Sequence, residues 1–179
     1  MISASMAECI LPFSKKENKM RACVFAGTFD PITKGHAFVI EKCLETFDKV
    51  VVALGVNKDK KPMFSLEERV DMINLAFSNE KRIEIATFDG MLTDFMKDRG
   101  ILVNIRGIRN QDDYKYETTM ERYNRDMYPE MTTIFIPTPK ELVHVSSSAM
   151  RNIFLLGGDA RKYLPDGVYE YATAKLKDK

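Results

Sequence analysis

The sequence lacks two features that would assign it at once to a membrane or to nucleic acid. No apolar segment approaches the roughly 18 residues that a membrane-spanning helix needs. There is also no excess of one charge, because 27 basic residues face 26 acidic ones for a formal net charge of +1. A dedicated nucleic-acid binder usually has a strong basic excess. The balance still permits a local basic pocket for a small phosphorylated ligand.

Cysteine is scarce as well. The three cysteines, Cys9, Cys23 and Cys43, are widely spaced and form neither a disulfide framework nor a metal-binding motif. Cys23 and Cys43 lie in apolar runs, so we expect them to pack as small hydrophobic residues. We therefore expect a reducing, cytoplasmic setting without membrane association.

The N-terminal segment lacks the order of charge that a secretory signal has. Its short apolar piece, Cys9–Phe13, precedes the lysines, whereas a signal places positive charge before a longer apolar core. We expect residues 1–20 to be a disordered N-terminal extension, an upstream start or a cloning remnant. Residues 21–179 then form one domain, which the chain length and a hydrophobic content of 45% can support.

Along this domain, short β-rich runs alternate with segments of helical apolar spacing. The runs are Arg21–Ala26, Lys49–Gly55, Arg82–Thr87, Ile101–Ile105 and Met131–Ile136. Helical spacing appears in Ala37–Phe47, Leu66–Phe77, Tyr116–Met127, Ser147–Leu156 and Asp166–Leu176. Ser65 and Glu68 make a capping box, and Pro129 and Gly157-Gly158 are stop signals. The alternation predicts an α/β fold: a Rossmann-like, doubly wound sheet of five parallel strands in a single domain.

In such sheets, ligands bind at the carboxyl ends of the strands. The first strand runs directly into residues 27–36, GTFDPITKGH, here called the first turn. Gly27 permits close approach of the backbone to a ligand, and Thr28 supplies a hydroxyl. His36 falls in the first turn of the following helix, where free N–H groups and the helix dipole favour an anion. The alternative is a tight turn with a surface histidine.

A second phosphate signal opens a later helix. Residues 145–151, VSSSAMR, here called the serine segment, place three serines before Arg151. One serine suffices as an N-cap, so the other hydroxyls and the cation are free to bind the outer phosphates of a triphosphate.

Two middle segments also follow strands. Arg106 and Arg109 flank Gly107-Ile108 after the fourth strand, which suits bidentate phosphate capture, and Glu117 lies downstream. The lysines of Lys58–Lys61 follow the second strand. Each of these segments also has a plain interpretation as a solvated charged face.

The glycine spacings of the dinucleotide fingerprint and of the P-loop are both absent. Instead, Thr33-Lys34-Gly35-His36 resembles the Thr/His-x-Gly-His signature of the nucleotidylyltransferase superfamily, and the serine segment resembles its Ile-Ser-Ser-Ser-x-x-Arg element. With Lys60–Arg69 and Arg106–Glu117 in the same order, residues 21 to about 176 resemble the bacterial phosphopantetheine adenylyltransferase family. The resemblance implies adenylyl transfer from ATP to 4′-phosphopantetheine, giving dephospho-coenzyme A and pyrophosphate in coenzyme A synthesis.

Residue roles follow from this resemblance by position. His36 is expected to stabilise the transition state and Thr28 to contact both substrates, with Lys60 and Arg109 also in the catalytic set. The phosphopantetheine site is expected to contain Thr28, Lys60, Leu92 and Arg106. The ATP site is expected to contain Thr28, Phe29, His36, Gly107, Ile108, Arg109, Glu117, Leu142, Val143, His144, Val145, Ser146, Ser147, Ser148 and Arg151.

Mg²⁺ is expected on the triphosphate, held mainly by phosphate oxygens and water, because the sequence shows no dedicated carboxylate cage. The resemblance also implies a homohexamer, and the shared site makes feedback inhibition by coenzyme A an expectation. Leu142-Val143-His144 departs from the aromatic-Ser-aromatic stretch usual in the family, which affects the adenine and ribose pocket; His144 also fits a partly exposed position on the pocket wall. Residues 1–20 have no counterpart there.

Three alternatives stay open at this point. A related nucleotidyltransferase could act on nicotinate mononucleotide or glycerol 3-phosphate, although these enzymes typically carry His at the position of Thr33. A non-catalytic nucleotide sensor would be marked by loss of Thr28, His36 or Lys60, all of which are present. An interaction module could use the 11 methionines, although most occupy core-like helical positions.

Overall fold

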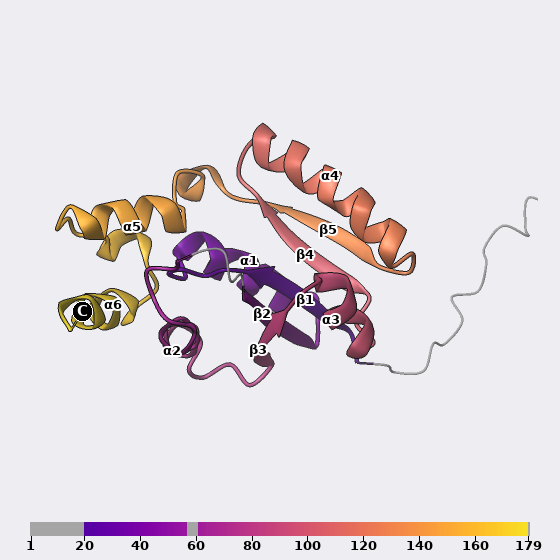
Figure 1. The fold of residues 1–179 in the computed structure, drawn as a ribbon, viewed down its shortest axis with the longest axis horizontal. Helices are drawn as coiled ribbons and strands as arrows, with labels where there is room; N and C mark the ends of the chain where they lie inside the picture. The colour runs from indigo at the N-terminus through magenta and orange to yellow at the C-terminus, as the bar shows by residue number, and fades with distance from the viewer. Residues whose placement is uncertain (1–19, 57–60, 179) are drawn as a thin grey trace, which may run out of the picture.

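The computed structural model describes residues 20–56 and 61–178, and within these ranges five strands form one parallel sheet in the order β3-β2-β1-β4-β5 (Figure 1). The strands are β1 (Ala22–Gly27), β2 (Lys49–Val56), β3 (Ile83–Asp89), β4 (Val103–Ile108) and β5 (Thr132–Pro137). The predicted doubly wound α/β fold with five parallel strands is confirmed. Arg106, Gly107 and Ile108 belong to β4 itself, so the strand ends later than its sequence pattern indicated.

The helices in the described ranges are α1 (Lys34–Leu44), α2 (Leu66–Ala76), α3 (Leu92–Asp98), α4 (Gln111–Met127), α5 (Ser147–Leu155) and α6 (Val168–Lys177), with short 3₁₀ turns at Lys140–Leu142 and Arg161–Tyr163. The Ser65–Glu68 capping box at the start of α2 is confirmed. Helix α4 begins before the predicted pattern because the side chain of Asn110 accepts a hydrogen bond from the Asp113 N–H. None of these helices is both long and apolar enough to cross a membrane.

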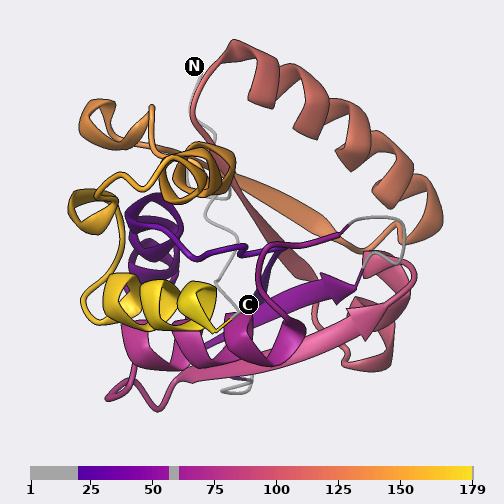
Figure 2. The same ribbon diagram turned by 60° about the vertical axis from the view of Figure 1, so that its left-hand side comes forward.

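Side chains alternate between the two faces of the sheet, and each face has its own core. On one face, Cys23, Phe25 and Val52 pack with apolar residues of α1, α2, α5 and α6. On the other face, Val24 and Val51 pack against Met96 of α3 and against residues near the end of α4. Figures 1 and 2 show the helices on both sides of the sheet. Cys23 and Cys43 are fully buried in the first core, as expected.

The order of the strands determines where on the sheet a ligand site can form. The chain runs outward from β1 to β2 and β3, then returns to pair β4 on the other side of β1 and continues to β5. In doubly wound sheets a crevice forms at this reversal, beyond the carboxyl ends of the two central strands. Here those ends are the first turn after β1 and the Arg106–Arg109 segment at the end of β4, so the topology brings the two predicted motifs together.

Candidate active site

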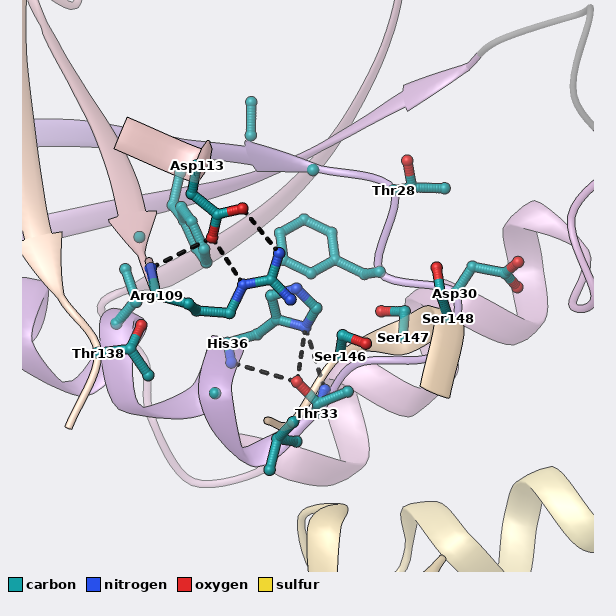
Figure 3. Close-up of a pocket in the computed structure, with 18 of the residues that line it drawn as sticks. Thr28, Asp30, Thr33, His36, Arg109, Asp113, Thr138, Ser146, Ser147 and Ser148 are labelled. Carbon is teal, nitrogen blue, oxygen red and sulfur yellow. Dashed lines mark hydrogen bonds and ion pairs between the residues drawn. The ribbon is translucent and has the colours of Figure 1, made fainter. Parts of the chain in front are cut away.

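A cavity of about 470 Å³ opens at the carboxyl ends of β1 and β4. Its walls come from the first turn, the start of α1, the end of β4, the inner side of α4, the serine segment and residues 61–62. Segments separated by more than a hundred residues therefore meet around one space. Figure 3 shows His36, Arg109 and the three serines around this space.

The first turn is shaped by close packing of an aromatic ring. A Cβ added at Gly27 would lie 3.0 Å from the Phe29 ring, so glycine allows that ring to fold back over β1. Phe29 has a left-handed backbone with φ of 50° and is almost fully buried. Its ring meets the imidazole of His36 edge-on, with 5.0 Å between ring centroids and an interplanar angle of 72°. Phe29 therefore supports the imidazole from one side.

The orientation of His36 is fixed by the start of its own helix. Thr33 is the N-cap of α1, and its hydroxyl accepts a hydrogen bond from the His36 backbone N–H at 3.4 Å. In return, the Thr33 backbone N–H donates to Nδ1 of His36 at 3.1 Å. Because Nδ1 is the acceptor, the proton of the neutral imidazole lies on Nε2.

Electrostatics keep this imidazole neutral. Burial, followed by the positive charges of Arg109 and Arg106, lowers the pKa of His36 from 6.5 to about 4. At neutral pH the ring therefore carries one N–H, on Nε2, as a hydrogen-bond donor. This is the state that can donate to a phosphate oxygen without removing a proton from the substrate.

Arg109 follows β4 and is held by the helix after it. Asp113 accepts from its Nε at 2.8 Å, from its Nη2 at 3.1 Å and from its backbone N–H at 3.2 Å (Figure 3). Burial raises the pKa of the Asp113 carboxyl, but the hydrogen bonds from Arg109 outweigh this and leave the pKa below its ordinary value. The carboxylate thus stays ionised and orients the guanidinium at the pocket.

Arg106 is bound to two neighbouring elements. Its Nε donates to Glu117 of α4 at 2.8 Å, its Nη2 donates to the other oxygen of that carboxylate, and its Nη1 donates to the Ala26 carbonyl at 2.8 Å. These bonds engage three of the five guanidinium N–H groups. Glu117 therefore contributes by positioning Arg106, a contact that sequence did not indicate.

The three serines of α5 have separate contacts. Ser146 is the N-cap and accepts from the Ala149 N–H at 3.2 Å. Ser147 donates to the Pro31 carbonyl at 2.8 Å, and Ser148 accepts from Arg151 at 3.0 Å. Arg151 also donates to the Asp30 carbonyl at 2.7 Å. The start of α5 is therefore attached to the first turn.

Most of the predicted site residues line this one cavity: Thr28, Phe29, His36, Arg106, Gly107, Arg109, Glu117, Val145, Ser146, Ser147, Ser148 and Arg151. Others do not appear among its lining residues: Leu92, Ile108, Leu142, Val143 and His144. The ring of His144 packs edge-on against Tyr163, with 5.6 Å between centroids. Lys60 lies outside the described residues, whereas its neighbours Lys61 and Pro62 line the cavity.

The cavity also contains polar residues that sequence reasoning did not select. Asp113 lies four residues after Arg109 at a helix start, a spacing at which opposite charges commonly pair, so it could have been found. Thr138 comes directly after β5, where the carboxyl-end rule points. The contacts of Asp30 join segments far apart in the chain, and no local pattern signals them.

The cavity lies where the strand order of the parallel sheet reverses, and it combines a neutral histidine, two arginines and a serine-capped helix start. This is the arrangement of a nucleotidyltransferase. Consistent with this, residues 24–153 match the family described as Cytidylyltransferase-like. The chain belongs to the phosphopantetheine adenylyltransferase family within that class. It is 37% identical over 159 residues to the phosphopantetheine adenylyltransferase of Heliobacterium modesticaldum, covering 89% of this chain and 95% of that protein. It is 38% identical over 160 residues to that of Clostridium tetani, covering 89% of this chain and all of that protein.

Solved structures agree on the fold. A bifunctional NMN adenylyltransferase/ADP ribose pyrophosphatase from Francisella tularensis superimposes with a TM-score of 0.71 at 19% identity, over 89% of this chain. A complex of the same description with AMP and a manganese ion gives a TM-score of 0.68 at 18% identity. The chain spans 50% of each of those larger proteins.

Proposed function

We propose that this protein transfers the adenylyl group of ATP to 4′-phosphopantetheine, forming dephospho-coenzyme A and releasing pyrophosphate. The proposal rests on membership of the phosphopantetheine adenylyltransferase family over almost the whole length of its relatives. The cavity adds the chemical support, because it gathers donors for phosphate oxygens from β1, β4, α1 and α5. Related activities on nicotinate mononucleotide or glycerol 3-phosphate are not favoured.

The reaction needs positioning and charge stabilisation more than a base. A phosphate oxygen of the acceptor attacks the α-phosphorus of ATP, and the bond from that phosphorus to the bridging oxygen of the β-phosphate breaks. The nucleophile is already anionic, so the obstacles are repulsion between anions and charge that accumulates on the α-phosphate. A fixed neutral donor such as His36 Nε2–H stabilises that charge without itself changing protonation.

The remaining donors divide between the leaving group and the acceptor. Arg109, Arg151 and the free N–H groups at the start of α5 would bind the outer phosphates and stabilise pyrophosphate as it departs. Thr28, Arg106 and Lys60 would hold the acceptor phosphate, with Leu92 along the pantetheine arm. Gly107 and Phe29 would border the nucleotide, as would Ile108 and Leu142–Val145.

Mg²⁺ fits this site only as a partner of the triphosphate. The carboxylates that line the cavity already accept hydrogen bonds: Asp30 from backbone N–H groups, Asp113 from Arg109 and Glu117 from Arg106. Within residues 20–56 and 61–178, no group of three or more His, Cys, Asp or Glu side chains forms a metal site. When bound to the phosphates, Mg²⁺ supplies charge neutralisation. Ser148 and Thr28 would offer hydroxyl oxygens to its water shell.

We also propose a cytoplasmic homohexamer. On this chain, the support is a set of exposed apolar residues on neighbouring elements: Tyr114, Tyr116 and Tyr123 of α4, and Ile134 on the edge strand β5. Burial against other copies would remove this apolar area from water. Sedimentation equilibrium measures the state directly, and a monomer at micromolar concentration would contradict the proposal.

The decisive experiment compares acceptors. Pyrophosphate release from ATP is measured with 4′-phosphopantetheine, nicotinate mononucleotide and glycerol 3-phosphate at equal concentrations. We expect release with 4′-phosphopantetheine alone, accompanied by equimolar dephospho-coenzyme A. Preference for either of the other acceptors would overturn the assignment of substrate while leaving the nucleotidyltransferase class intact.

A further inference from the structure

Asp30 is a buried charged residue in the first turn, with only 3% of its surface exposed. Its two carboxylate oxygens accept hydrogen bonds from two consecutive backbone N–H groups of the segment before α2. Oδ2 accepts from the Met63 N–H and Oδ1 from the Phe64 N–H, both at 2.9 Å. In Figure 3 its carboxylate is directed away from the imidazole of His36. Asp30 therefore binds a second segment of chain instead of facing the α-phosphate.

The segment it holds forms one wall of the cavity. Met63 and Phe64 follow directly on Lys61 and Pro62, which line the cavity, and precede Ser65, the N-cap of α2. The two hydrogen bonds therefore fix the position of Lys61 relative to the first turn. A carboxylate accepting two backbone N–H groups is a charge-assisted arrangement, stronger than neutral hydrogen bonds of the same length.

A buried arginine repeats the connection from the other direction. Arg69 of α2 is 5% exposed, and its Nη1 donates to the Thr28 carbonyl at 2.8 Å. Its Nε donates to the Ser65 carbonyl at 3.3 Å. Burial lowers the pKa of Arg69, and the nearby charge of Asp30 opposes that shift. Thr28 is thus tied through its own backbone to the helix that follows the lysines.

We propose that Asp30 is a positioning residue for the acceptor: with Arg69, it holds the Lys61–Pro62 wall at a fixed distance from Thr28 and so places the acceptor phosphate in line with the α-phosphorus. This inference rests on the proposed function. The ATP side depends on Asp30 in a different way. Arg151 and Ser147 bind the backbone carbonyls of Asp30 and Pro31, which a change of side chain at residue 30 leaves in place. The carboxylate itself adds a longer ion pair on this side, with 3.6 Å between Arg151 Nη1 and Asp30 Oδ2. The side chain of Asp30 therefore affects chiefly the acceptor.

Asp30→Asn tests this separation. The amide keeps the shape of the side chain, but its NH₂ faces a backbone N–H, so one of the two hydrogen bonds is lost. We expect the KM for 4′-phosphopantetheine to rise by about tenfold or more and kcat to fall, because small misplacements of a reacting group are costly. The dissociation constant for ATP, measured by titration calorimetry without acceptor, should change less than about threefold.

Arg69→Lys is the second variant and is expected to act in the same direction, since a lysine keeps the charge but does not reproduce both carbonyl contacts. Tyr171→Phe is the control for stability. It removes the hydrogen bond from the Tyr171 hydroxyl to Asp71, 2.5 Å long, which joins α6 to α2 away from the cavity. We expect Tyr171→Phe to lower the melting temperature and leave the acceptor KM unchanged.

The outcomes separate the two levels of proposal. If the wild-type protein does not use 4′-phosphopantetheine, the proposed function fails, and this inference fails with it. If the wild type is active but Asp30→Asn shows only a lower melting temperature, like Tyr171→Phe, then Asp30 is purely structural and the inference alone is overturned. If Asp30→Asn does not fold, an unchanged acceptor KM in Arg69→Lys overturns it.

Discussion

At the scale of single residues, the imidazole of His36 has both its direction and its protonation state set by neighbours. The Thr33 N–H donates to Nδ1, Phe29 packs against the ring, and burial together with the charges of Arg109 and Arg106 disfavours a second proton. Nε2–H is then a preorganised donor whose bond strengthens only as charge develops on the α-phosphate. Such a donor lowers the barrier more than it tightens ground-state binding.

His36→Ala should therefore reduce kcat by at least about 10²-fold, the usual effect of losing one transition-state donor. The dissociation constant for ATP should change far less, because arginines and backbone N–H groups carry most of the phosphate binding. Single-turnover kinetics and ATP titration measure the two effects. Lys42→Ala, at an exposed position of the same helix, is the control. A variant with unchanged kcat would remove His36 from the catalytic role.

The lowered pKa of His36 also predicts how stability depends on pH. Between pH 6.5 and about 4 the unfolded imidazole binds a proton while the folded one does not, so stability falls as the pH is lowered through this window. The component amounts to at most about 3 kcal/mol. Urea unfolding of the wild type and of His36→Ala at pH 7, 5.5 and 4.5 isolates this component. The difference in unfolding free energy between the two proteins should change with pH. Parallel curves for the two proteins would contradict the assignment.

Sequence predicted much of the site at this scale for a simple reason. Thr28, His36, Arg106 and Arg109 lie at or just beyond the carboxyl ends of two neighbouring strands, so the carboxyl-end rule brings them together without knowledge of the fold. The supporting contacts were not predictable in the same way. The bonds of Asp30 to residues 63 and 64 depend on how the segment before α2 crosses the first turn, which no local pattern encodes.

At the scale of elements, the helix starts carry much of the function. Helices α1, α2 and α5 each begin with a side-chain cap, and two of these starts face the cavity. Apolar spacing predicted all three helices, and the caps of α2 and α5 could also be read from sequence, whereas Thr33 was not recognised as the cap of α1. Helix α3 could not, because it has only seven residues and no side-chain cap at Met91. The spacing of Tyr116, Tyr123 and Met127 correctly predicted a helix. These side chains are exposed, however, so the spacing follows a surface of the helix and not its core-facing side.

The serines at the start of α5 should respond differently to substitution. Ser146→Ala removes the N-cap and should cost about 1 kcal/mol of stability, which for a domain of this size is a fall in melting temperature of roughly 2–4 °C. Ser148→Ala leaves the cap intact but removes the hydroxyl that accepts from Arg151, so it should weaken ATP binding with little change in melting temperature. Equal melting temperatures for the two variants would contradict this division of roles.

At the scale of the whole molecule, the cavity is assembled from both halves of the sheet. β1 and the first turn belong to one half and β4 to the other, while α5 comes from the C-terminal part of the chain, before α6. The sequence predicted this fold because the alternation of strands and helices leaves few topologies with right-handed crossovers. A ligand that contacts all of these parts stabilises the folded chain as one unit.

ATP should therefore raise the stability of the entire domain in a single cooperative transition. At an ATP concentration one hundred times the dissociation constant, linkage predicts about 2.7 kcal/mol, or roughly 5–10 °C in melting temperature. Differential scanning calorimetry with and without ATP measures the shift, and Arg151→Ala should reduce it at the same ATP concentration because affinity falls. Two transitions, only one of which moves with ATP, would show that residues 21–179 are not a single domain and that the site does not join the two halves of the sheet.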